Sequence, residues 1–383
     1  MRIMHLSDLH LGKCILEQTL IDDQRYILNE IMNIILDKRV DVVLIAGDVY
    51  DKGIPNIEAV RLFSDFLANL YKNNIKVFII SGNHDSKDRL SFGNELFVDN
   101  SVYIEGIFNG NLRCVELEDE YGKMLIYMLP FVKPADVRGY YSDVEINSYN
   151  DAIKTIIDNT NIDKNNRNII MVHQFVTASG VEIERSDSES LSLGGIDNID
   201  VSLFENFDYV ATGHIHRGQK LIKETVRYAG SPLKYSFSEV NHKKSVPIIE
   251  FKEKGNIDIE LVELKPIRDM RIIKGKLENL LDSEIVKLGN TSDYISAIVT
   301  DDDFIMDAIG KLRCVYKNIL RLEYQNKRTV SLEDNSFVCD NVNKKSEIDL
   351  FSEFYLKQNN VVLDMERLDL VNSVIKECID NDI

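Results

Sequence analysis

The sequence lacks the features that define several large classes of protein. Its five cysteines are scattered and none forms a Cys-x-x-Cys pair, which argues against a zinc site and a disulfide framework and favours free thiols in a reducing compartment. No stretch approaches the roughly 18 uninterrupted apolar residues of a membrane span. The first residues contain no apolar segment that would act as a signal peptide. We therefore expect a cytoplasmic protein that is not associated with a membrane.

Positive charge is also scarce, because 45 Lys and Arg residues stand against 63 Asp and Glu residues, for a formal net charge of −18. This balance argues against a protein that coats nucleic acid through bulk electrostatic attraction. It does not exclude an enzyme that acts on nucleic acid, since bound cations and a local basic patch can attract phosphate. No Gly-x-x-x-x-Gly-Lys-Ser/Thr loop is present, so any use of ATP requires a partner that binds it.

The order of apolar and amphipathic stretches predicts a large α/β domain over residues 1–265. Apolar runs at 3–6, 42–46 and 76–80 alternate with helical patterns at 22–37 and 56–71, which predicts a parallel sheet covered by helices. Further strands are expected at 102–105, 112–117 and 124–129, where the short spacing suggests an antiparallel continuation. Strands at 169–172, 209–211, 225–228, 246–251 and 256–262 and a helix at 151–158 complete the predicted domain.

Pro266 marks the next predicted boundary. Beyond it, expected strands at 271–275, 294–299 and 319–324 enclose helices at 276–281 and 304–314, which predicts a small α/β domain over 266–340. The polar stretch 340–346 is typical of a linker. Residues 346–383 then show two acidic amphipathic helical patterns, and two such helices cannot form a core alone.

Five short clusters of Asp, Asn and His residues follow apolar runs. They comprise Asp8 and His10; Asp48 and Asp51; Asn83, His84 and Asp85; His173; and His214 and His216. Ligands bind beyond the carboxyl ends of parallel strands, so one fold can bring all five clusters together. One such cluster alone is commonly a helix cap or a turn, but five in this order are much more specific. The two other histidines, His5 and His242, are expected to be structural or surface residues.

These residue types predict a site for two metal ions. Imidazole, carboxylate and amide ligands without thiolates favour Mn²⁺, Fe²⁺ or Zn²⁺. The carboxylate of Asp48 has two oxygens and can bridge two cations. Two cations roughly 3.5–4 Å apart stabilise both the attacking and the leaving oxygen of a phosphate displacement.

The motifs Asp-x-His, Gly-Asp-x-x-Asp, Gly-Asn-His-Asp, His and Gly-His-x-His resemble the signature of the calcineurin-like metallophosphoesterases. Segments 8–13, 82–93, 228–239, 266–269 and 348–355 resemble, more closely, the SbcD family, the nuclease subunits of SbcC–SbcD complexes. This resemblance covers nearly the whole chain. It implies a four-layer α-β-β-α sandwich, a small α/β capping domain and a C-terminal helical tail.

The resemblance also implies roles for individual residues. Asp8, His10, Asp48 and His216 would hold one Mn²⁺, and Asp48, Asn83, His173 and His214 would hold the second. His84 would be the catalytic residue that stabilises or protonates the leaving oxygen. Some members of the family carry a histidine where this chain has Asp51, so we expect Asp51 to give only a supporting hydrogen bond. Asp85 either holds His84 or caps a turn.

The function implied is that of a Mn²⁺-dependent DNA nuclease with double-strand 3′–5′ exonuclease and single-strand endonuclease activity. It would process DNA ends and hairpins in recombination, repair and replication, as a homodimer within a heterotetramer with the ATPase SbcC. Expected DNA contacts are Lys13, Arg89, Lys234 and Tyr235, within or beside segments rich in aromatic, hydroxyl and basic groups. Lys243 and Lys244 either belong to this surface or form a solvated turn.

The tail helices are expected to dock on SbcC through Phe351, Phe354 and Tyr355, as a helix-in-groove contact. The alternative is that they pack on their own chain. Two further functions stay open at this point: a metallophosphatase acting on nucleotides or phosphoproteins, and a non-catalytic scaffold that retains the fold.

Overall fold

The structure is a computed structural model that describes residues 1–383 except 190–196, 304, 326–346, 360–361, 363 and 382–383. The chain divides into two compact units, Met1–Met270 (unit 1) and Arg271–Ile383 (unit 2). We predicted a boundary between residues 265 and 266. The predicted linker at 340–346 lies outside the described residues.

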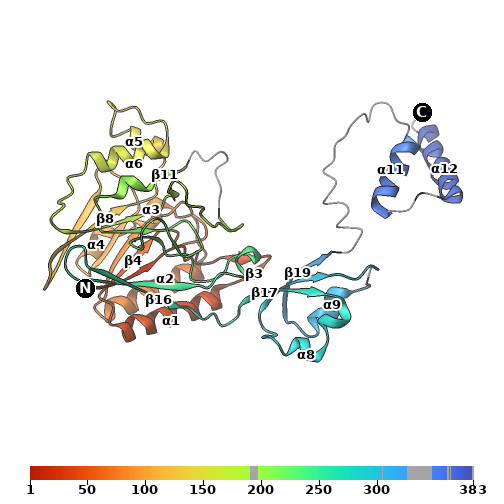
Figure 1. Ribbon diagram of the computed structural model, residues 1–383, viewed down its shortest axis with the longest axis horizontal. Coiled ribbons are helices and arrows are strands. Elements are labelled where there is room, and N and C mark those ends of the chain that lie inside the picture. The colour runs from red at the N-terminus through yellow and green to blue at the C-terminus, as the bar shows by residue number, and fades with distance from the viewer. Residues whose placement is uncertain (190–196, 304, 326–346, 360–361, 363, 382–383) are drawn as a thin grey trace. The chain divides into compact units, whose positions relative to one another are not determined.

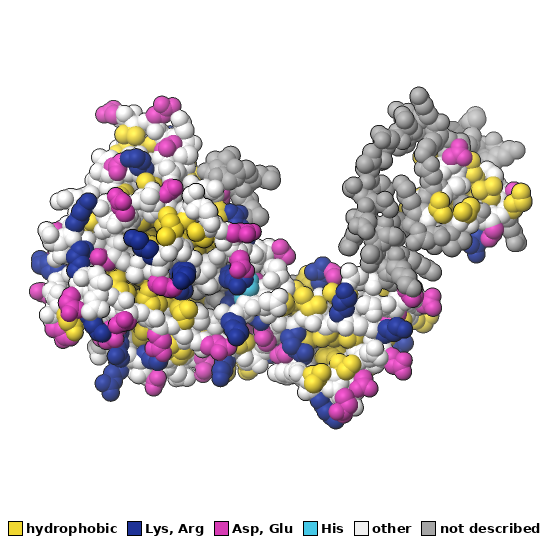
Figure 2. Space-filling view, viewed as in Figure 1, with side chains coloured by type: hydrophobic (Ala, Val, Ile, Leu, Met, Phe, Trp, Pro, Cys, Tyr) yellow, Lys and Arg dark blue, Asp and Glu magenta, His cyan; other side chains and the backbone are white. Residues whose placement is uncertain are grey.

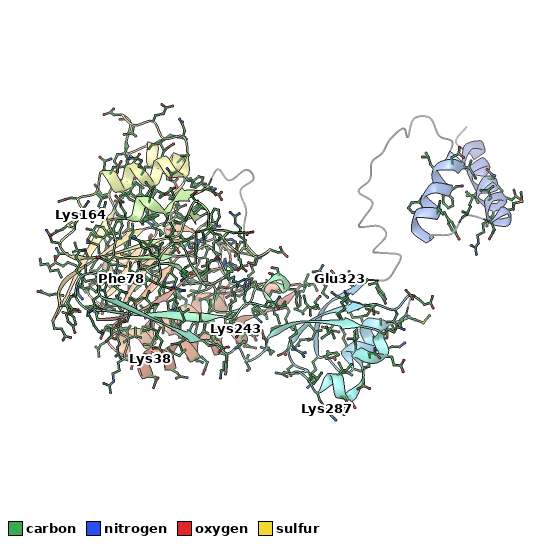
Figure 3. All side chains as sticks on the ribbon, viewed as in Figure 1. Lys38, Phe78, Lys164, Lys243, Lys287 and Glu323 are labelled. Carbon is green, nitrogen blue, oxygen red and sulfur yellow. The ribbon has the colours of Figure 1, made fainter. Side chains whose placement is uncertain are left out.

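Unit 1 contains two six-stranded sheets. The first has the order β16 (Ile257–Glu263), β15 (Ser245–Phe251), β1 (Arg2–Leu6), β4 (Val42–Ala46), β5 (Lys76–Ile80) and β6 (Val102–Glu105). The second has the order β13 (Gln219–Lys220), β14 (Val226–Tyr228), β12 (Tyr209–Thr212), β9 (Arg167–Val172), β8 (Gly122–Leu129) and β7 (Arg113–Asp119). One apolar core joins the two sheets, with Leu44 and Phe78 from the first packed with Ile126 and Met171 from the second. Figure 3 labels Phe78 within this core.

Helices lie outside both sheets. Figure 1 shows α1 (Ile21–Lys38) and α2 (Ile57–Lys72) on one side of the sandwich, and α5 (Pro134–Arg138) and α6 (Tyr149–Asp158) on the other. The helix α2 begins as its sequence predicts, because the side chain of Asn56 accepts a hydrogen bond from the Ala59 amide at 2.8 Å. The helix α6 buries Ile153 and Ile156 against the second sheet. The predicted α-β-β-α sandwich is confirmed.

The strands that precede the five clusters run parallel to one another within each sheet. β1, β4 and β5 are parallel in the first sheet, and β9 and β12 are parallel in the second. The predicted antiparallel continuation was wrong for residues 102–105, because β6 pairs parallel with β5. Two short helices, α3 (Lys87–Leu90) and α4 (Asn94–Val98), form the connection that this parallel pairing requires. Of the three strands in this predicted continuation, only β7 and β8 form an antiparallel pair, in the second sheet.

Small elements complete unit 1 around its connections. They are β2 (Cys14–Ile15), β3 (Gln18–Thr19), β10 (Val176–Thr177), β11 (Ile199–Asp200) and the 3₁₀ turns η1 (Val201–Phe204) and η2 (Phe237–Glu239). Figure 2 shows acidic and basic side chains interspersed on the visible face of unit 1. Among the described residues on that face, no uniformly basic surface is formed.

Unit 2 begins with a small three-stranded sheet of the kind predicted. Its strands are β17 (Met270–Gly275), β18 (Tyr294–Val299) and β19 (Asn318–Tyr324), and its helices are α7 (Leu277–Leu280), α8 (Ser283–Val286) and α9 (Ala308–Arg313). Leu277, Ile295 and Leu312 form its core. The helix α9 is shorter than predicted, because Asp307 caps it by accepting a hydrogen bond from the Gly310 amide.

Two helices follow in the C-terminal part of unit 2, α11 (Glu347–Asn359) and α12 (Met365–Asn381), as the amphipathic patterns predict. Within the part of the chain that the structure describes, no helix is both long and apolar enough to cross a membrane.

Candidate metal centre

The structure brings the five predicted clusters to one place. β1, β4 and β5 deliver three of them, and β9 and β12 of the second sheet deliver the other two, each cluster just beyond the carboxyl end of its strand. Asp8, His10, Asp48, His173 and His216 are all at least 98% buried. Asn83, His84 and His214 are only half-buried, so the centre is more open on their side.

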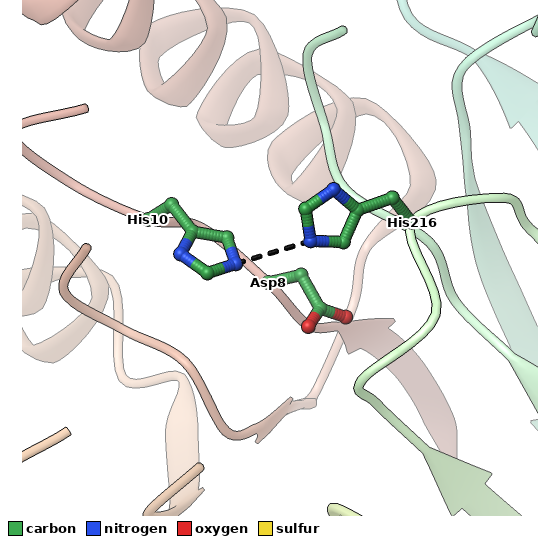
Figure 4. Close-up of side chains that lie close together, drawn as sticks. All are labelled: Asp8, His10 and His216. Atoms are coloured by element: carbon green, nitrogen blue, oxygen red, sulfur yellow. Dashed lines mark hydrogen bonds between the residues drawn. The ribbon is translucent and has the colours of Figure 1, made fainter. Parts of the chain in front are cut away.

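One group of candidate ligands consists of Asp8, His10 and His216, whose ligand atoms lie within 4.8 Å of one another (Figure 4). Nε2 of His10 and Nε2 of His216 face each other at 3.1 Å. Ligand atoms about 2.1 Å from one octahedral ion would lie roughly 3 Å apart, so this spacing fits a shared cation.

A second group consists of Asp48, Asn83, His173 and His214. Nε2 of His173 lies 3.3 Å from Oδ2 of Asp48 and 3.1 Å from Oδ1 of Asn83, and that amide oxygen lies 3.0 Å from Nδ1 of His214. Oδ2 of Asp48 also lies 3.5 Å from Nε2 of His10. The Asp48 carboxylate therefore lies between the two groups, where a bridging ligand is needed.

The backbone is strained at these residues. Asp8, His10, Asp48 and His214 all have positive φ, at 53°, 43°, 50° and 91°. For residues other than glycine such backbone costs on the order of 1–3 kcal/mol each and persists only where the surroundings enforce it. Here hydrogen bonds enforce it, because the amides of Asp8 and His10 donate to the carbonyls of Gly47 and Asp48 at 3.0 Å.

Glycines allow the loops to meet. A Cβ atom at Gly82 would lie 2.0 Å from Oδ1 of Asp48, and one at Gly213 would lie 2.0 Å from the carbonyl oxygen of Ala46. Neither position has room for a side chain. The glycines of the Gly-Asn-His-Asp and Gly-His-x-His motifs are therefore required for close packing.

The buried charges of the centre are suited to a cation. Burial alone would raise the pKa of Asp48, but His173 and His10 outweigh that effect and hold it well below its usual range. Burial would likewise lower the pKa of His173, but Asp48 and Asp8 raise it to about 9. The buried carboxylates thus attract positive charge, and a divalent ion supplies it more strongly than a proton on His173.

His84 and Asp51 lie together beside this centre. The backbone carbonyl of Asp51 is 2.9 Å from Nδ1 of His84, and the His84 amide donates to Oδ1 of Asp48 at 2.8 Å. The carboxylate of Asp51 forms an ion pair with Lys13 at 2.8 Å and lies 3.6 Å from Nδ1 of His10. Asp51 therefore supports His84 through its backbone and His10 through its side chain.

Asp85 holds a turn rather than the His84 ring. Its carboxylate accepts hydrogen bonds from the amides of Val49, Tyr50 and Gly82 at 3.1, 3.0 and 2.9 Å. Burial and the nearby Asp48 raise the pKa of Asp85 to about 6. Asp85 therefore links the loop after β5, to which it belongs, to the loop after β4 that contains Asp48 and Asp51.

Several expected DNA contacts are turned inward. Tyr235 is only 3% exposed and its hydroxyl donates to the Leu9 carbonyl, so the prediction that it contacts DNA was wrong. Lys234 is engaged with Asp269 at 2.8 Å and with the Val240 carbonyl. Lys13 is engaged with Asp51, whereas Arg89 is exposed.

The two lysines at 243 and 244 differ sharply. Lys243 is exposed on the surface of unit 1 (Figure 3), whereas the Lys244 side chain is buried against Glu239 at 2.6 Å. Neither of the two interpretations of this pair was right for Lys244. Aromatic and basic composition near a site does not reveal which side chains point inward.

Sequence reasoning missed several residues that surround the centre. Glu239 is fully buried 3.5 Å from His216, and Ser188 Oγ lies 2.7 Å from Nδ1 of the same ring. The exposed Arg185 stacks its guanidinium 3.7 Å from the centre of the Phe175 ring, and that ring contacts His214. Glu239 belongs to a segment that carries the resemblance, but nothing local in the sequence assigns it to His216.

Comparison with known proteins gives matches over both units. Residues 1–218 match the family described as calcineurin-like phosphoesterase, and residues 266–359 match the family described as type 5 capsule protein repressor C-terminal domain. The SbcD component of the nuclease SbcCD from Staphylococcus epidermidis is 30% identical over 386 residues, a match that covers 100% of both chains.

Solved structures with a similar fold have much lower identity. GAP50, the anchor in the inner membrane complex of Plasmodium, is 11% identical with a TM-score of 0.43, and the match covers 84% of this chain and 96% of that one. A dimetal phosphatase from Danio rerio is 12% identical with a TM-score of 0.41, and the match covers 70% of this chain and 97% of that one.

Proposed function

Because this chain belongs to the calcineurin-like phosphoesterases and, within them, to the SbcD family of nuclease subunits, we propose that it is a Mn²⁺-dependent DNA nuclease working with an SbcC-type ATPase. It is a metal-dependent hydrolase of phosphodiester bonds. The observation that carries the proposal is the pair of ligand groups that share Asp48.

We propose that each of the two ligand groups binds one metal ion. Asp8, His10, Asp48 and His216 hold one ion, and Asp48, Asn83, His173 and His214 hold the other. Two bound divalent cations supply charge that stabilises the attacking and leaving oxygens of the phosphodiester. The absence of thiolates and the mixture of nitrogen and oxygen donors favour Mn²⁺, Fe²⁺ or Zn²⁺. Among these we propose Mn²⁺, the ion that the family resemblance implies.

His84 is the catalytic residue in this proposal. Its Nδ1 faces the Asp51 carbonyl, which can only accept, so Nδ1 carries a proton. Nε2 is then the ring atom available to the leaving sugar oxygen, and when the ring carries a second proton there it can donate that proton to this oxygen. The His84 ring also packs edge-on against His10 at 4.8 Å, which orients it toward the centre.

The substrate in this proposal is the sugar–phosphate backbone of DNA ends and hairpins. Double-strand 3′–5′ exonuclease and single-strand endonuclease activities would both use the one centre. Exposed Arg89 and Arg185 are the basic residues that we assign to phosphate contacts. They take the place of Tyr235, whose side chain is buried.

The ATPase partner would bind the tail helices. Phe351 and Phe354 on α11 are 38% and 56% exposed, whereas the Tyr355 hydroxyl accepts a hydrogen bond from Arg367 of α12 at 2.7 Å. Hydrophobic side chains gather on the visible face of this helix pair (Figure 2). We therefore assign Phe351 and Phe354 as anchors on SbcC and Tyr355 as a brace between the helices. Substitution F354D should abolish co-purification with SbcC while leaving Mn²⁺ binding unchanged.

A second copy of this chain would bind an apolar surface of unit 1, to give a homodimer within a heterotetramer. An open cavity of about 570 Å³ lies among residues of α2, α3, α4 and β6, and Phe92, which lines it, is 83% exposed. Apolar patches of this kind mark protein interfaces. Sedimentation of F92E as a monomer would support this, and an unchanged dimer would contradict it.

The central experiment measures the release of nucleotides from linear duplex DNA with Mn²⁺, with and without SbcC and ATP. H84A should lower the rate of nucleotide release at least 100-fold. The control K164A changes an exposed lysine distant in sequence from His84 and should leave that rate unchanged. Hydrolysis of small phosphoesters alone would favour the metallophosphatase. Clearly fewer than two ions per chain in Mn²⁺-replete buffer would favour the non-catalytic scaffold.

A further inference from the structure

A buried ion pair lies behind one of the metal-ligating histidines. Glu239 and Lys244 are 0% and 7% exposed, and Nζ of Lys244 is 2.6 Å from Oε2 of Glu239. Buried charges cost free energy unless all their hydrogen-bonding capacity is used. The pair therefore needs an explanation beyond stability.

Every proton of Lys244 has an acceptor. Besides Glu239, Nζ donates to the Ser231 hydroxyl and to the backbone carbonyl of His216, both at 2.8 Å. An ammonium group has three donors and no acceptor, so Lys244 is fully engaged. It holds the Glu239 carboxylate and the His216 backbone in one arrangement.

Ser188 connects this pair to the ring of His216. Its hydroxyl lies 2.6 Å from Oε1 of Glu239 and 2.7 Å from Nδ1 of His216. A carboxylate paired with an ammonium group can only accept, so the one proton of the Ser188 hydroxyl goes to Glu239. The hydroxyl oxygen must then accept from His216, which requires a proton on Nδ1.

A proton on Nδ1 of His216 determines the state of Nε2, the other nitrogen of that ring. With Nδ1 protonated, Nε2 of His216 keeps its lone pair, and Nε2 is the atom that faces His10 at 3.1 Å in the first ligand group. His173 has a simpler arrangement, because its Nδ1 lies 2.6 Å from the Ala46 carbonyl. His216 obtains the same tautomer through a side-chain relay.

We propose that Lys244, Glu239 and Ser188 form a positioning relay that sets the tautomer and orientation of His216 for metal binding. The inference rests on the proposed function, because it assumes that Nε2 of His216 binds a cation. These three residues touch neither the substrate nor the reacting atoms. Their effect passes entirely through His216.

The test compares S188A with S188T in the full-length chain. Both change the same half-buried position, but only S188T keeps the hydroxyl. Titration calorimetry with Mn²⁺ should show two ions on the wild-type chain. Supporting partners of metal ligands are typically worth 10–100-fold in affinity, so S188A should bind one ion 10–100-fold more weakly. S188T should restore that affinity to within about threefold.

A second readout follows the tautomer itself. In metal-free protein labelled with ¹⁵N-histidine, His216 should be protonated at Nδ1 in the wild type and in S188T, and should lose that preference in S188A. The thermal midpoints of the three metal-free chains should agree, which excludes a general loss of structure.

The outcomes distinguish failure of the relay from failure of the proposed function. Absence of Mn²⁺ binding to the wild-type chain would overturn the proposed function. Wild-type affinity for both ions in S188A, or equal weakness of S188A and S188T, would overturn the relay and leave the nuclease proposal intact.

Discussion

The replacement of Gly213 by alanine tests the geometry of the centre most directly. A Cβ atom there would lie 2.0 Å from the Ala46 carbonyl oxygen and 2.6 Å from Nδ1 of His173. These two atoms are themselves hydrogen-bonded at 2.6 Å. The added methyl group would therefore force apart the bond that orients a metal-ligating histidine.

The expected cost has two parts. Overpacking a close-packed site costs about 1–3 kcal/mol, and leaving a buried hydrogen-bonding group without its partner costs about 1–3 kcal/mol more. A loss of roughly 2–6 kcal/mol should lower the thermal midpoint by about 5–15 °C in a unit of this size. Because His173 loses its orientation, Mn²⁺ affinity should also fall by roughly 10–100-fold.

Gly139→Ala is the matched control. No atom lies within 4 Å of a Cβ built at Gly139, and its φ of −63° suits any residue. That substitution should leave the midpoint unchanged or raise it slightly, by reducing the freedom of the unfolded chain. Calorimetric melts of both variants, with and without Mn²⁺, measure the difference. If G213A melts within about 1 °C of the wild type and binds both ions, the close packing described for the centre is wrong.

Three further predictions concern residues outside the ligand groups. Burial, together with Arg227, lowers the pKa of His5 to about 3, so the unfolded chain takes up a proton that the folded chain excludes. The free energy of unfolding should therefore keep its full value above pH 6.5 and fall as the pH drops toward 3, by up to about 1.4 kcal/mol per pH unit. In urea unfolding at pH 4–7, H5Q should show a weaker dependence of this free energy on pH than the wild type, and the same dependence in both chains would contradict the assignment. R185Q should raise the KM for DNA with little change in kcat and reduce the salt dependence of binding by about one ion, whereas an unchanged salt slope would remove Arg185 from the substrate contacts. R167M should destabilise unit 1 by about 3 kcal/mol in chemical denaturation, since the buried guanidinium pairs with Asp119, and a loss below about 1 kcal/mol would show that this pair is dispensable.

The ligand groups were the most predictable part of the protein. Asp8, Asp48, Asn83, His173 and His214 each follow a short apolar run, and the hydrophobic pattern alone places the ends of those runs. Parallel strands present their carboxyl ends at one edge, so strand order brings together the three clusters of the first sheet and, separately, the two clusters of the second. The packing of the two sheets then joins the five clusters. The structure places Nδ1 of His214 3.0 Å from Oδ1 of Asn83 within the second group, and Nε2 of His173 4.0 Å from Oδ1 of Asp8 across the two groups.

The pairing of β6 was less predictable. Its residues 102–105 were correctly recognised as a strand, but its direction depends on the connection that precedes it. That connection contains α3 and α4, of four and five residues, which are too short for a helical period to be recognised.

The surroundings of the centre could not be predicted residue by residue. Tyr235 and Lys244 have the composition of a phosphate-binding surface, yet both side chains are buried and hydrogen-bonded within unit 1. Glu239 lies well beyond His216 in the chain, and no periodic pattern connects the two. Contacts of this kind depend on how separate loops fold over one another.

The sequence by itself determined which residues can bind metal and at which end of the sheets they lie, because strand formation and strand-end position follow from local hydrophobic pattern. Only the tertiary structure decided which atoms face one another. It placed Asp48 between the two ligand groups and Nδ1 of His216 against Ser188, and it turned Lys244 from a candidate DNA contact into a buried partner of Glu239. The physical reason is that side-chain direction and burial are set by contacts between segments far apart in the chain, and local composition carries no trace of those contacts.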